Sequence, residues 1–108
     1  MADFDDFLAA LKDNAAVLAK ETFDGYEAQA KQDAETFIDK AKDDLKRWTK
    51  LLADGDINEE DFSDLVNAKK ALAEMFALRQ AGLSLIKLEK FRKSFINLVV
   101  DTAFEVFV

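Results

Sequence analysis

Apolar residues recur at steps of three and four along most of the chain, and this spacing places them along one side of an α-helix. The first stripe covers residues 4–18, with Asp3 as the predicted N-cap, and the second covers residues 30–52. A third stripe covers residues 62–81 and a fourth covers residues 83–99. The pattern therefore predicts an all-α fold in which almost every segment is helical.

The residue types support the same fold. The chain has 108 residues, no proline and only three glycines, so the usual interrupters of helices are almost absent. Half of the residues are hydrophobic and ten are phenylalanine, which gives the chain enough apolar surface to offset the entropy lost on folding. Because there is no fixed-period repeat and no low-complexity linker, we expect one helical domain over residues 1–108.

The segment LLADGDINEEDF predicts a tight reversal between two helices. Gly55 suits a left-handed C-terminal cap, and Asn58 suits the N-cap of the next helix, with Asp61 three residues later as the second half of a capping box. Ile57 and Phe62 flank this cap and can form a hydrophobic staple. We therefore place the reversal at Gly55 to Ile57.

The same segment resembles the second half of a calcium-binding loop, which is the competing interpretation. With Gly55 at the sixth position of such a loop, the first and third positions fall on Lys50 and Leu52, where calcium requires oxygen ligands. The twelfth position falls on Asp61, which is shorter than the usual bidentate Glu. We therefore predict a helix-to-helix turn without calcium.

A reversal at this point would lay the two halves of the chain side by side in opposite directions, with position i level with position 112 − i. Residues 1–64 carry 18 Asp and Glu against 8 Lys and Arg, a net charge of −10, whereas residues 65–108 carry 4 against 7, a net charge of +3. Complementary charges would therefore set the register of an antiparallel helical hairpin. The rule pairs Lys69 with Asp43 and Arg79 with Asp33.

Two glycines, Gly25 and Gly82, fall nearly level under this rule and leave two arrangements open. Either both arms bend there and give a compact bundle of four segments, or each arm stays about 50 residues and roughly 75 Å long. We favour the long arms, with or without a kink near the two glycines, packed with a second hairpin as a helical bundle.

The C-terminal sequence FINLVVDTAFEVFV is the reason for this preference. It is apolar in nearly every direction around a helix, and one amphipathic neighbour cannot cover it. We therefore predict that the segment lies in an interface between copies of the chain, with a dimer as the favoured state. The candidate interface residues are Phe91, Phe95, Ile96, Val99, Val100, Phe104 and Phe107.

The chain contains neither cysteine nor histidine, which removes thiolate and imidazole groups from any site chemistry. Its consecutive acidic pairs, Asp43 with Asp44 and Glu59 with Glu60, point in different directions around a helix. We therefore expect no enzyme, no catalytic residues, no cofactor and no metal site. The net charge of −7 also argues against nucleic-acid binding, which requires a basic surface.

The N-terminal sequence MADFDDFLAALKDN carries three Asp before its first Lys, unlike a secretory signal, so we expect a cytoplasmic protein. The functional hypothesis is a small non-enzymatic helical protein that self-associates, or binds a protein partner, as an interaction or structural module. The alternative is reversible attachment to a membrane surface through residues 83–108. In that segment an apolar run too short to span a bilayer follows the basic residues Lys87, Lys90, Arg92 and Lys93.

Overall fold

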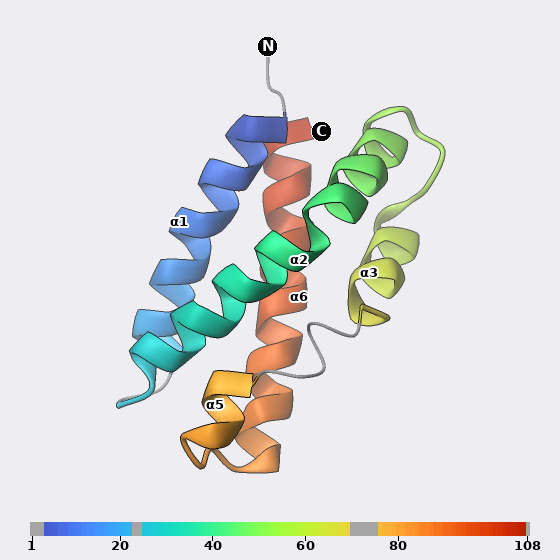
Figure 1. The fold of residues 1–108 in the computed structure, drawn as a ribbon. Coiled ribbons are helices and arrows are strands. Elements are labelled where there is room, and N and C mark those ends of the chain that lie inside the picture. Colours follow the sequence, from blue (N-terminus) through green and yellow to red (C-terminus); the bar gives the residue numbers. More distant parts are fainter. Residues whose placement is uncertain (1–3, 23–24, 70–75, 108) are drawn as a thin grey trace.

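The computed structural model describes residues 4–22, 25–69 and 76–107, and all regular secondary structure in these ranges is helical. The predicted all-α fold is therefore confirmed for the described residues. The helices, shown in Figure 1, are α1 (Phe4–Thr22), α2 (Glu27–Ala53), α3 (Glu59–Asn67), α5 (Phe76–Gln80) and α6 (Leu85–Phe107).

The helices run up and down past one another and form a compact bundle (Figure 1). Helix α1 packs against α2 and α6, while α2 also packs against α3, α5 and α6, and α3 packs against α6. The ring centroids of Phe7 and Phe107 lie 5.7 Å apart, so the start of α1 meets the end of α6. In the part of the chain that the structure describes, α3 and α5 lie between α2 and α6 in the sequence.

The structure corrects the expected length of the hairpin arms. Arms of roughly 75 Å do not fit a molecule that measures 41 × 23 × 19 Å along its principal axes. The chain changes direction between α1 and α2, where Gly25 has φ +86°, and between α5 and α6, where Gly82 has φ +90°. Each predicted arm is therefore divided near its glycine. Residues 70–75, which belong to the third predicted stripe, lie outside the described residues.

The turn between α5 and α6 is built from backbone hydrogen bonds. The N–H of Gly82 donates to the carbonyl of Arg79 at 3.1 Å, and the N–H of Leu83 donates to the carbonyl of Leu78 at 3.2 Å. This pair of bonds is a Schellman cap, which requires a left-handed residue that glycine supplies without a side-chain clash. The Ser84 hydroxyl oxygen then accepts a backbone N–H from the first turn of α6 at 3.3 Å. The chain can therefore end one helix and begin the next within four residues.

Aromatic side chains contact one another in the core between the helices. Phe37 of α2 meets Phe95 of α6 edge to face, with ring centroids 5.3 Å apart and planes at 90°. Phe91 stacks on Phe95 at 6.1 Å, and Trp48 of α2 is also buried. The largest fully buried side chains are Phe7, Phe37, Phe62, Phe91, Phe95, Leu11, Ile38, Leu45, Leu78, Val66 and Val99.

Acidic side chains of α2 hold the segment between α2 and α6 in register. Asp44 forms an ion pair with Lys69, which the charge pattern predicts to lie level with the neighbouring Asp43. Asp33, predicted to lie level with Arg79, accepts two backbone N–H groups in the first turn of α5, both at 2.9 Å. The antiparallel register between α2 and this segment therefore agrees with the charge rule to within one or two residues at these two points.

Candidate interaction site

The predicted interface on α6 lies mostly inside the molecule. Five of its seven residues are buried in the core of the same chain: Phe91, Phe95, Ile96, Val99 and Val100. Phe104 and Phe107 are half-buried and pack against that core. Because α1, α2 and α3 pack around α6, the apolar helix finds its cover within one chain. These residues therefore belong to the core of their own chain, and a contact with a second copy stays a prediction.

The turn residues all lie at the junction of α2 and α3. Gly55 has φ +80°, and its N–H donates to the carbonyl of Leu52 at 3.1 Å, as in a Schellman cap. The Asn58 side-chain oxygen accepts the N–H of Asp61 at 2.8 Å, and the Asp61 carboxylate accepts the N–H of Asn58 at 3.2 Å. Both halves of a capping box are therefore present. Beside the cap, Ile57 packs on the hydrophobic core, to which the fully buried Phe62 belongs.

Helical backbone occupies the first half of the stretch that resembles a calcium loop. Helix α2 continues through Lys50 and Leu52 to Ala53, so the first four loop positions are helical and Leu52 is buried. Among the residues that the structure describes, no group of three or more His, Cys, Asp or Glu side chains could hold a metal ion.

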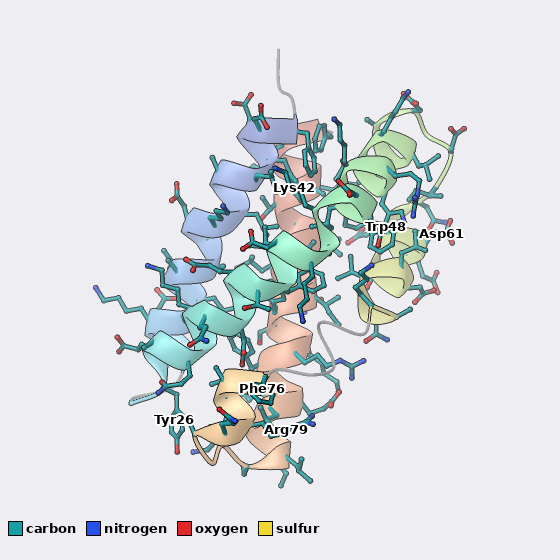
Figure 2. The ribbon with its side chains drawn as sticks, in the orientation of Figure 1. Tyr26, Lys42, Trp48, Asp61, Phe76 and Arg79 are labelled. Atoms are coloured by element: carbon teal, nitrogen blue, oxygen red, sulfur yellow. The ribbon has the colours of Figure 1, made fainter. Side chains whose placement is uncertain are left out.

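Most of the exposed large apolar residues of the described ranges belong to α5 and to the first turn of α6. Phe76 is 66% exposed, Leu85 is 78% exposed and Ile86 is 83% exposed. In the described ranges, Val17 of α1 is the other large hydrophobic side chain left exposed, at 54%. We call Phe76, Leu85 and Ile86 the α5–α6 corner, because they belong to the end of the molecule where α5 turns into α6 (Figures 1 and 2).

Ile86 falls within the fourth predicted stripe, residues 83–99, but the structure leaves it exposed. Ile86 stands three and four residues before Glu89 and Lys90, which are both exposed, so it shares their polar side of α6. Leu85 lies on the apolar side, three residues before the buried Leu88, but it is in the first turn and remains exposed. Steps of three and four residues backward from the buried Leu88 pass over Ile86. The helical spacing itself would therefore have identified Ile86 as a surface residue.

Basic side chains surround the corner. Arg79 lies on α5 close to Phe76, as Figure 2 shows, and Lys87 and Lys90 are exposed on the first two turns of α6. The nearby Glu89 pairs with Arg92 at 2.8 Å. The corner therefore combines aliphatic surface with positive charge on a chain whose net charge is negative.

A groove lined by acidic side chains lies between α3 and α6. It is open to solvent, has a volume of about 400 Å³ and is lined by Asn58, Glu59, Glu60, Ser63, Asp64, Asn97, Val100 and Asp101. Four of these residues carry exposed carboxylates, and Val100, 4% exposed, supplies an apolar floor. We call this feature the acidic groove. Helix α3 forms one wall of the groove. The capping box fixes where this wall begins, because Asn58 is the N-cap of α3 and also lines the groove.

The corner and the groove offer charge and apolar surface, a combination that suits contact with another macromolecule. No sequence motif could have located either surface, because each combines residues from two different helices. Comparison of the chain with protein-family models, with curated proteins and with solved structures gave no match.

Proposed function

We propose that this protein is a non-enzymatic helical module that self-associates, and that the α5–α6 corner is its contact surface. The observation that carries the proposal is the exposure of Leu85 and Ile86, at 78% and 83%. Burying an aliphatic side chain of this size contributes about 1.5–3 kcal/mol, so two neighbours left in water favour association. Exposed apolar residues grouped together mark interaction sites more often than residues that occur singly.

The size of the corner indicates a reversible contact. Three apolar side chains cover much less area than the roughly 1,200–2,000 Å² of total surface that stable complexes bury. Charged neighbours such as Lys87 and Lys90 would add specificity and salt dependence to the contact. We therefore expect association that depends on protein concentration, instead of a permanent dimer.

The test replaces the aliphatic part of the corner with polar side chains. In the double variant Leu85→Gln/Ile86→Gln, we expect the average mass measured by sedimentation across a concentration series to stay that of a monomer. Both positions are exposed, so the fold should persist, which circular dichroism can check. The matched control is Val17→Gln, another exposed apolar residue, which should associate like the unchanged protein.

Two results would contradict the proposal. One is an unchanged protein that stays monomeric at every concentration, and the other is an equal loss of association in Val17→Gln. Truncation of residues 95–108 is not a suitable test, because it removes the buried Phe95 and Val99 and would disrupt the core.

Attachment to a membrane surface is the second candidate, and the same corner favours it. Leu85 and Ile86 could enter the headgroup region of a bilayer while Lys87 and Lys90 contact anionic lipid. The later apolar residues of α6 face the core, so only its first turns are available. Within the described ranges, no helix combines the length and apolar character needed to cross a bilayer. Flotation with anionic vesicles, compared with zwitterionic ones, would detect this mode, and the absence of a lipid-dependent shift would reject it.

A further inference from the structure

We infer that the α5–α6 corner of one copy docks into the acidic groove of a second copy, so that the molecules assemble head to tail. This inference rests on the proposed self-association and adds the acceptor surface and the geometry. Its basis is that the two surfaces are chemically complementary and lie on different parts of the same molecule.

The groove has the chemistry to accept the corner. Exposed carboxylates stand on both of its walls, with Glu60 and Asp64 on α3 and Asp101 on α6. Val100 between them offers an apolar floor to an aliphatic side chain. A ligand that fits this lining is both aliphatic and cationic.

The corner presents such a ligand. Ile86 and Lys90 are four residues apart on one side of α6, and Lys87 is exposed on the same turn. Lysine carries its ammonium group on an apolar stem, so it can approach apolar surface while its charge meets a carboxylate. The aliphatic residues would therefore face Val100 while the ammonium groups face the groove walls.

Charge also decides against the simpler symmetric pairing. Two corners placed face to face would bring Lys87 and Lys90 against their own copies, and this repulsion opposes the apolar contact. Two acidic grooves placed face to face would repel for the same reason. Corner against groove brings opposite charges together on both sides of the contact.

The α5–α6 corner of a molecule cannot reach the acidic groove of the same molecule. Ile86 and Val100 belong to the same straight helix and are separated by about 21 Å along it, at about 1.5 Å per residue. The contact therefore joins two different surfaces of two copies, which makes it heterologous. Such contacts leave one corner and one groove free at the ends, so they give chains or closed rings.

The experiment pairs two variants that each keep one surface. Leu85→Gln/Ile86→Gln removes the corner, and Asp64→Lys/Asp101→Lys reverses the charge of the groove. Each variant alone should have a dissociation constant raised by about tenfold or more, measured by sedimentation. An equimolar mixture should form a 1:1 complex and stop at twice the monomer mass, because each complex has one intact contact and no further pair of intact surfaces.

The control carries the same change in net charge away from the groove. Glu35→Lys/Asp39→Lys alters two exposed acidic residues of α2 and should assemble like the unchanged protein. Circular dichroism of all variants separates a lost contact from a lost fold.

The outcomes separate this inference from the proposed function. If the groove variant assembles like the unchanged protein while the corner variant does not, the head-to-tail inference is overturned and self-association through the corner stands. If the mixture grows beyond two copies, or fails to form a complex, the inference is overturned as well. If the unchanged protein stays monomeric and floats with anionic vesicles, the partner of the corner is a membrane, and both proposals of self-association fail.

Discussion

At the scale of single residues, Asn58 is the side chain whose role is most sharply defined. It caps α3 through its side-chain oxygen and also lines the acidic groove. Asn58→Ala would leave the N–H of Asp61 without this acceptor, and we expect the free energy of unfolding to fall by about 1 kcal/mol. Urea denaturation measures this change.

The control for this prediction is Asn58→Ser, which keeps a side-chain oxygen at the N-cap and should lose much less stability. Equal losses in the two variants would show that the hydrogen bond to Asp61 contributes nothing measurable.

At the scale of elements, α5 depends on a side chain from another helix. It has only five residues, far too few for a helix to be stable by itself in water. Asp33 of α2 accepts two N–H groups in its first turn. In Asp33→Ala, these groups lose their partner, and we expect about 1 kcal/mol less stability and faster amide hydrogen exchange in residues 76–80.

Asp39→Ala is the matched control, because Asp39 lies on the same helix but is exposed. It should leave the exchange of residues 76–80 unchanged. Faster exchange in both variants would mean that the effect comes from α2 itself and not from the cap on α5.

The predictability of each element depends on how local its cause is. The reversal after α2 could be predicted, because Gly55, Asn58 and Asp61 act on the backbone within a few residues of themselves. The division of the arms could not, because a glycine inside a helix costs only about 1 kcal/mol, and tertiary packing decides whether the helix continues. The exposure of Leu85 is equally nonlocal, since it depends on how far α6 extends past its neighbours.

At the scale of the whole molecule, the ion pair of Asp44 and Lys69 joins two segments that are distant in sequence. The hydrogen bond from the Lys69 ammonium lowers the pKa of the Asp44 carboxyl below its ordinary value of 3.8. A folded-state pKa lowered in this way adds stability above the unfolded-state pKa, and the contribution disappears as pH falls through the folded-state value. The pair therefore stabilises the fold at neutral pH and ceases to do so in acid.

We expect Asp44→Asn to lower the free energy of unfolding at neutral pH by less than about 1 kcal/mol, since solvent reaches the pair. The difference in stability between about pH 7 and about pH 3 should also shrink relative to the unchanged protein. Urea denaturation at both pH values checks this, with the exposed neighbour Asp43→Asn as the control. An undiminished pH dependence in Asp44→Asn would contradict the role of the pair.

The whole molecule also explains why the cover of the apolar C-terminal helix could not be located from the sequence. An apolar C-terminal helix needs cover on several sides, and the pattern shows the need without showing which segment meets it. In the structure, α1, α2 and α3 of the same chain cover α6, because each turn brings the next helix back alongside the earlier ones.

The contact between Phe7 and Phe107 sets where anything joined to either end of these helices would emerge. Both rings lie at the pole where α1 begins and α6 ends, and the α5–α6 corner lies at the other pole (Figure 1). A fluorescent protein, an affinity handle or a surface linker fused at either end would therefore project away from Leu85 and Ile86. Molecules anchored to a surface by their ends would therefore present Leu85 and Ile86 to the solution, which is the orientation needed to measure binding at the corner.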